Sequence, residues 1–136
     1  RAPLKIAEKL KLRIGSEVLV ITRLRTVNGQ PFCVETSYIP AEIVPGLCRD
    51  DLEKNDASLY SIMQNRYDIR FAVNNETLKI SFATQDEADL LGLKHNEPVM
   101  LLRLVVSDIN DRPVEYLKSV NHPRRVVFRS VSTPYI

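Results

Sequence analysis

Residues 18–40, VLVITRLRTVNGQPFCVETSYIP, have the pattern of a β-hairpin, and the rest of the fold is organised around it. Val and Ile are concentrated before the turn, as is typical of strands. The dipeptide Asn28-Gly29 is a strong signal for a tight turn between antiparallel strands. We therefore expect two neighbouring strands, one on each side of this turn.

Arg23 and Arg25 must share one face of the first strand, because strand side chains alternate with a period of two. The face of Glu35, in the second strand, depends on the turn. A two-residue turn pairs Val27 with Gln30 and places Glu35 on the face opposite the arginines. The length of the turn therefore decides whether the three charges meet.

A three-residue loop over 27–29, with a left-handed glycine, pairs Thr26 with Gln30 instead. The side chains that then share one face are those of Arg23, Arg25, Cys33 and Glu35. We favour this register, since Val27 is a poor flank for a two-residue turn and the clustered charges compensate one another.

Two interpretations of this charged face are open. It can be the solvated outer face of a sheet, where cross-strand Arg and Glu pairs are common and contribute little. It can also be a rigid pair of guanidinium groups for an anion, with Glu35 accepting from ligand hydroxyl groups. The spacing of the residues does not choose between them.

Outward from the hairpin, helical and strand patterns alternate without a βαβ rhythm. A helix is expected from Leu4 after Pro3, another over 58–67 capped by Asn55 or Asp56, and a third opened by the capping box of Thr84 and Glu87 and ended by Gly92. Residues 69–82 are expected to form one long strand or two short strands interrupted at Asn74 and Asn75. Further strands are expected over 98–107, 113–121 and 126–132. This order predicts an α+β domain with an antiparallel sheet of about six strands and short helices.

Two stretches of the chain resemble each other. AEKLKLRIGSEVLVI (7–21) aligns with ADLLGLKHNEPVMLL (88–102) at an offset of 81, and NGQP (28–31) aligns with NDRP (110–113) at an offset of 82. The slip of one residue requires a bulge or a longer second turn. The repeat predicts one continuous sheet with two related halves, and the crease between them is a plausible ligand site.

Composition excludes several classes of function. The net charge of +2 gives no basic surface for gripping DNA, and no apolar run reaches the roughly 18 residues of a membrane span. Two cysteines and two histidines have no spacing typical of disulfide frameworks or metal ligands. We expect a cytoplasmic protein without metal or cofactor, and the start at Arg1 is expected to mark a fragment of a longer chain.

The hairpin, SLYSIMQNRY (58–67) and ATQDEADLLGLKHNEPVMLLRLVVSDINDRPVEYLKSV (83–120) together resemble the UTRA domain, the effector-binding half of HutC-type GntR-family transcriptional regulators. The likeness runs from about residue 4 to residue 130. Its individual motifs are modest, but their order and spacing are specific.

This resemblance implies a chorismate-lyase-like fold over 1–136, a homodimer, and operator binding only through a winged helix-turn-helix preceding Arg1. It implies that Arg23 and Arg25 hold the anionic end of a small effector, such as a sugar phosphate. Glu35, Ser58 and Glu115 would also line the pocket, with the serine at a helix start where amide groups favour an anion.

The secondary candidates for effector contact are Arg103, Asn121 and Tyr67, and Tyr60 is interpreted as a core or interface residue. Three functions remain: a ligand-sensing regulatory domain without enzymatic activity, a chorismate-lyase-like enzyme acting on a small carboxylate, and a dimerisation domain with a vestigial pocket. The family resemblance favours the first, and so do two arginines suited to an anion in a sequence that shows no nucleophile-base pair.

Overall fold

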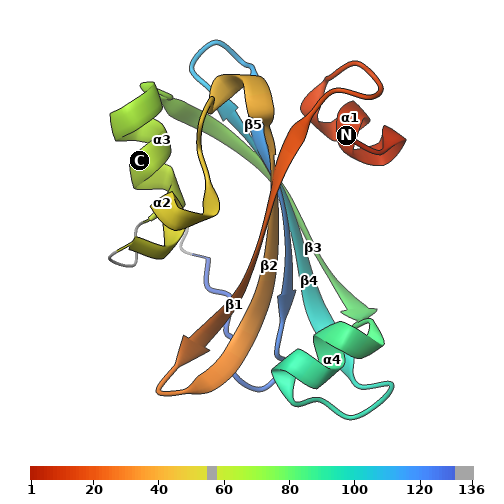
Figure 1. Ribbon diagram of the computed structural model, residues 1–136. Coiled ribbons are helices and arrows are strands. Elements are labelled where there is room, and N and C mark those ends of the chain that lie inside the picture. The colour runs from red at the N-terminus through yellow and green to blue at the C-terminus, as the bar shows by residue number, and fades with distance from the viewer. Residues whose placement is uncertain (55–57, 131–136) are drawn as a thin grey trace, which may run out of the picture.

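One antiparallel sheet runs through the computed structural model, which describes residues 1–54 and 58–130. Its strands are β1 (Val18–Val27), β2 (Gln30–Pro40), β3 (Phe71–Phe82), β4 (Pro98–Asp108) and β5 (Pro113–Asn121). They lie in the order β1-β2-β5-β4-β3 (Figure 1). The predicted α+β class, an antiparallel sheet with short helices, is confirmed.

The described residues contribute five strands to this sheet. A further strand was expected over 126–132. Residues 126–130, the part of this range that the structure describes, have no regular secondary structure and no strand partner. Residues 131 and 132 lie outside the described part of the chain. No helix in the described ranges is long and apolar enough to cross a membrane.

Helices cover both faces of the sheet. Figure 1 shows α1 (Leu4–Leu10) and α4 (Gln85–Leu91) on one side, and α2 (Arg49–Glu53) and α3 (Leu59–Tyr67) on the other. A short 3-10 turn, η1 (Ala41–Ile43), connects β2 to the segment that carries α2 and α3. The core is correspondingly divided into three clusters, centred on α1, α3 and α4.

The helix ends follow local sequence signals. Thr84 and Glu87 form the predicted capping box, and Gly92 ends α4 in the left-handed conformation with φ 70°. Asn55 and Asp56, expected to cap the middle helix, lie outside the described residues. The described N-cap of α3 is Ser58, whose hydroxyl accepts from the amide of Ser61. The short helix α2 was not expected.

The two halves of the repeat are related in structure as well as in sequence. Helices α1 and α4 each end in a left-handed residue, Lys11 and Gly92, and each helix is followed by the same backbone hydrogen bond. Leu12 donates to Ala7 at 2.8 Å, as Leu93 donates to Ala88 at 2.9 Å. Strands β2 and β5 pair in the centre of the sheet and join the halves.

The first hairpin has a two-residue turn, so the favoured three-residue loop is wrong. Val27 pairs with Gln30, and both turn residues have positive φ, 50° at Asn28 and 75° at Gly29. A β-bulge at Phe32 then shifts the register by one residue, so that Arg25 lies opposite Cys33.

Because of this bulge, Arg23 also pairs with Glu35. The predicted clustering of Arg23, Arg25, Cys33 and Glu35 on one face is therefore correct, although a bulge rather than the turn produces it. The second hairpin contains a similar register shift between Val106 and Ser107.

Candidate functional site

A cavity of about 520 Å³ lies between the sheet and the α2 and α3 segment. Its lining combines polar and charged groups with leucine and isoleucine side chains. The residues are Ile21, Arg23, Leu24, Arg25, Glu35, Ser37, Leu52, Ser58, Leu59, Tyr60, Glu115 and Leu117. The volume is in the range of small-molecule sites. The structure thus brings together all five primary candidates, from β1, β2, β5 and the start of α3.

The two arginines of the site differ in environment. Arg25 donates from Nε to Oε2 of Glu35 at 3.2 Å, and its side chain is 48% exposed. Arg23 has a buried Nη2 atom without a hydrogen-bond partner. Leaving a buried charged donor unpaired is costly, so such an atom indicates a place where a ligand acceptor can bind.

Glu115 forms the floor of the cavity from the central strand β5. It is 1% exposed, and its Oε1 accepts a hydrogen bond of 2.5 Å from the Tyr60 hydroxyl. Burial raises the pKa of Glu115, and Glu35 raises it further. Hydrogen bonds from Tyr60 and Ser37 and the charge of Arg23 act in the opposite direction.

Tyr60 is held in place on its other side by Phe71. Their ring centroids are 4.9 Å apart in an edge-to-face arrangement. Burial, followed by the charge of Glu115, raises the pKa of the Tyr60 phenol, which therefore remains a donor. Tyr60 was interpreted from sequence as a core or interface residue. Its place in the site follows from the packing of α3 over β5, which no local pattern reveals.

Ser58 brings the first turn of α3 to the cavity. Its hydroxyl accepts from the Ser61 amide at 3.4 Å, a long and weak cap. The first amides of a helix carry no intrahelical partner and favour negative charge. The rim of the cavity at Ser58 therefore adds donors to those of the arginines.

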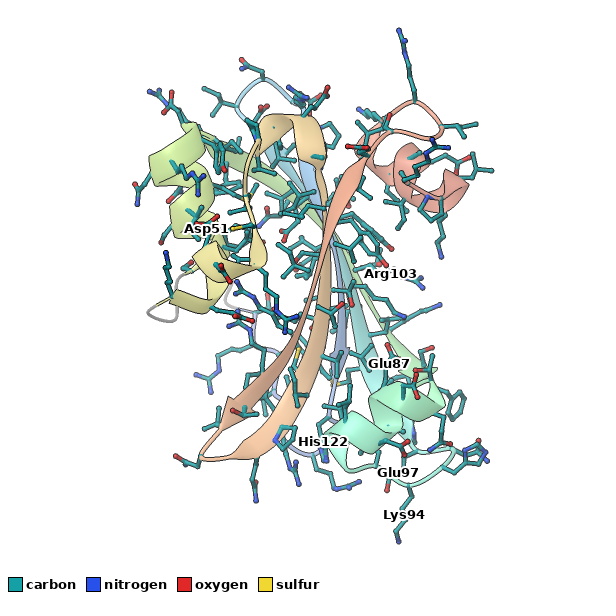
Figure 2. All side chains as sticks on the ribbon, in the orientation of Figure 1. Asp51, Glu87, Lys94, Glu97, Arg103 and His122 are labelled. Atoms are coloured by element: carbon teal, nitrogen blue, oxygen red, sulfur yellow. The ribbon has the colours of Figure 1, made fainter. Side chains whose placement is uncertain are left out.

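The secondary candidates do not line this cavity. Tyr67 donates to the Pro45 carbonyl at 2.9 Å, at the far end of α3. Asn121 is buried and donates to the Met100 carbonyl at 3.2 Å and to Ser119 at 3.1 Å. Arg103 lies opposite Lys118 in the pairing of β4 with β5, and its Nε is buried without a hydrogen-bond partner. Figure 2 shows Arg103 on the α1 and α4 side of the sheet. These three residues therefore lie outside the cavity, and a contact of any of them with an effector stays a prediction.

Cys33 lies beside the site but is a poor nucleophile. It is buried, and its Sγ is 3.0 Å from Oγ of Ser119. Burial raises the pKa of the Cys33 thiol to about 11, so it stays protonated near neutral pH. Among the described residues, no group of three or more His, Cys, Asp or Glu side chains is arranged to hold a metal ion.

Comparison with protein families gives one match over most of the chain. Residues 1–126 match the sequence model of the UTRA domain. The chain is 30% identical over 107 residues to the probable fructoselysine utilization operon transcriptional repressor of Escherichia coli K12, covering 79% of this chain and 43% of that protein. It is 32% identical over 126 residues to the transcriptional repressor PhnF of Mycolicibacterium smegmatis, covering 93% of this chain and 50% of that protein.

A similar solved structure is the ligand-binding domain of a GntR-family transcriptional regulator from Bordetella bronchiseptica. It superposes with a TM-score of 0.92 at 26% identity, covering 98% of this chain and 84% of that one. Such effector domains have the chorismate-lyase-like fold, so this part of the fold prediction is confirmed. The relatives are transcriptional regulators, which confirms the expectation of a regulatory domain rather than an enzyme. The chain spans about half the length of these curated relatives.

Proposed function

Because the chain belongs to the UTRA domain family, we propose that residues 1–136 form the effector-binding and dimerisation domain of a HutC-type GntR-family transcriptional regulator. The effector is a small anionic metabolite, with a sugar phosphate as the first choice. The regulator acts on operator DNA through a DNA-binding domain outside this chain, works in the cytoplasm, and is a homodimer.

The observation that carries the proposal is the unpaired Arg23 Nη2 in the same cavity as the buried Glu115. Arg23, Arg25 and the start of α3 supply donors for a phosphate or carboxylate. Glu35 and Glu115 supply acceptors for hydroxyl or amine groups. A ligand with an anionic end and a hydroxylated body satisfies both sets, whereas a purely apolar ligand leaves them unpaired.

The full set of proposed effector contacts is Arg23, Arg25, Glu35, Ser58 and Glu115, and the structure adds Tyr60. Both relatives are named as transcriptional repressors and neither name states an effector, so the chemistry of the cavity is the better guide to the effector class.

The test is a thermal-shift screen with three ligand groups: hexose 6-phosphates, the same sugars without phosphate, and small carboxylates. A ligand at a hundredfold excess over its Kd adds about 2.7 kcal/mol to the free energy of unfolding. We expect stabilisation by at least one phosphorylated sugar and none by its unphosphorylated counterpart. If no anion stabilises the domain, the proposed effector class is wrong.

A further inference from the structure

A row of polar side chains crosses the sheet on the α1 and α4 side, opposite the cavity. Strand pairing places one side chain of each strand directly beside one of the next strand. From β1 to β3, the members are Thr22, Thr36, Lys118, Arg103 and Thr77. Because Lys118 alternates along β5 with Leu117 of the cavity lining, it faces away from the cavity. We call these five residues the polar row.

Apolar clusters flank the polar row on both sides. On β5, Tyr116 belongs to the α1 cluster and Val120 to the α4 cluster, and Lys118 lies between them. The same order of apolar, polar and apolar side chains is found on β2 and β4. Figure 2 shows Arg103 at this level, between the two helices. The polar row therefore interrupts a face that two apolar clusters otherwise occupy.

Two cations stand side by side in this row. Arg103 and Lys118 lie directly opposite each other in the pairing of β4 with β5, an arrangement in which like charges destabilise a sheet. Nζ of Lys118 is 3.5 Å from Oε2 of Glu87 on α4. Within residues 1–54 and 58–130, Arg103 forms no ion pair, and its Nε is buried without a hydrogen-bond partner. The pair thus has one positive charge in excess and an unused donor.

The sequence repeat shows that the fold does not require cations at this level. The offset of 81 relates Thr22 to Arg103, and the offset of 82 relates Thr36 to Lys118. Thr22 lies opposite Thr36 just as Arg103 lies opposite Lys118, and the register shifts of the two hairpins also fall at equivalent places. Two threonines fill this position in one half of the sheet. Packing of the sheet therefore does not account for the two cations in the other half.

We propose that Arg103 and Lys118 bind a phosphate group on the α1 and α4 side of the sheet. The guanidinium of Arg103 matches two phosphate oxygens, and the ammonium of Lys118 adds a point charge. Thr36 and Thr77, their neighbours in the polar row, carry hydroxyl groups that can donate to further oxygens. Together these groups offer more donors than the two oxygens of a carboxylate can use. The site goes beyond the proposed function, since it shares no residue with the cavity.

The first experiment compares the free energy of unfolding in inorganic phosphate and in chloride, at the same pH and ionic strength. Phosphate should stabilise the wild-type chain in a saturable manner. Arg103→Thr and Lys118→Thr copy the residues of the first half of the sheet, and each should raise the Kd for phosphate by about tenfold or more. In chloride, Arg103→Thr should be at least as stable as the wild type, because it removes the repulsion between neighbouring cations.

The matched control is Arg112→Thr. Arg112 lies in the turn between β4 and β5, is 48% exposed and is paired with Glu42. This variant should keep the full stabilisation by phosphate. If Arg103→Thr loses the same stability in chloride as in phosphate, the role of Arg103 is structural and the site is overturned. A phosphate effect that Arg103→Thr leaves intact overturns it as well.

The second experiment separates the polar row from the cavity, which can also admit phosphate. Strands β3 and β4 contribute nothing to the cavity lining, so the backbone amides of Thr77 and Arg103 report on the row, and those of Ser58 and Leu59 report on the cavity. In nuclear magnetic resonance titrations with inorganic phosphate, the row amides should shift in the Arg23→Met variant as they do in the wild type. Shifts confined to the cavity amides, or row shifts lost in Arg23→Met, overturn the site.

The same titration identifies the source of the phosphate group. In the Arg23→Met variant, a hexose 6-phosphate that shifts the Thr77 amide at lower concentration than inorganic phosphate supports the site and identifies a phosphorylated metabolite as its ligand. Equal or weaker binding of the sugar phosphate supports the site and identifies free phosphate. If neither compound shifts the Thr77 amide, the polar row does not bind phosphate.

Discussion

Replacing Arg23 should weaken effector binding far more than replacing Arg25, although both side chains lie on one face of β1. A hydrogen bond to a charged group contributes about 1.5–3 kcal/mol. Arg23 belongs near the upper value because its Nη2 is buried and already separated from water. Arg25 belongs near the lower value because it is half-exposed and bound to Glu35, which competes with the ligand.

The variants Arg23→Met and Arg25→Met keep most of the apolar stem and remove the guanidinium. At about 1.4 kcal/mol per tenfold change in Kd, we expect a loss of roughly 100-fold for Arg23→Met and roughly tenfold for Arg25→Met. Isothermal titration calorimetry with the effector found by thermal shift measures both. Arg112→Met is the control, because Arg112 is also 48% exposed and paired with a carboxylate, Glu42, away from the cavity.

The stability of the domain without effector should not fall in parallel with effector affinity. Arg23→Met removes an unpaired buried donor, so the free energy of unfolding without effector should stay within about 0.5 kcal/mol of the wild type or rise. Equal losses of affinity in the two variants would refute the distinction between the arginines. Unchanged affinity in both would return the pair to the interpretation of a solvated outer face.

Four further predictions concern acid-base groups, the turn and the regulatory response. Because the pKa of Glu115 is raised on folding, its protonation contributes stability that is present below the unfolded pKa of about 4.5 and is lost as pH rises through the folded pKa. Glu115→Gln should remove this dependence of the free energy of unfolding on pH, as measured by urea titrations between pH 4 and 8. Burial, and then the charge of Arg125, lower the pKa of His122, whose Nδ1 accepts from the Arg124 amide at 3.1 Å. The free energy of unfolding should therefore fall as pH drops below about 6.5, the unfolded pKa of histidine. His122→Gln should abolish that fall. Gly29→Ala should cost about 1–2 kcal/mol in chemical denaturation because its φ of 75° strains any residue with a Cβ atom, and no measurable loss would contradict the two-residue turn. In the full-length protein, effector should change operator affinity by a coupling of about 1–3 kcal/mol, and operator should change effector affinity by the same factor; no change at saturating effector would mean that this domain is not the sensor.

The first turn and the start of α4 were predictable because their sequence signals are local. Asn28-Gly29 marks the first turn, and Thr84 with Glu87 marks the start of α4. The register of the first hairpin was not predictable from the turn alone, since the bulge at Phe32 reverses the consequence of the two-residue turn. A sequence pattern fixes alternation along a strand, but one extra residue moves the following side chains to the other face.

The site was predictable where it depends on strand alternation and family likeness, and it was missed where it depends on packing. Arg23, Arg25 and Glu35 lie together as expected. Tyr60 was missed because its contact with Glu115 spans 55 positions and requires α3 to lie over β5. The helix carries few local signals for that docking, and the segment before it includes α2, which is short and was not expected.

Tyr60 also connects the cavity to the rest of the sheet. Its hydroxyl binds Glu115 at the floor of the cavity, and its ring packs against Phe71, the first residue of β3. If an effector binds Glu115, we expect it to weaken or strengthen the Tyr60 hydrogen bond, and we expect the contact between Tyr60 and Phe71 to change with it. A ligand shifts this arrangement only as far as its affinity differs between the two states, so the strength of regulation depends on how much the Tyr60 and Glu115 contact changes upon binding.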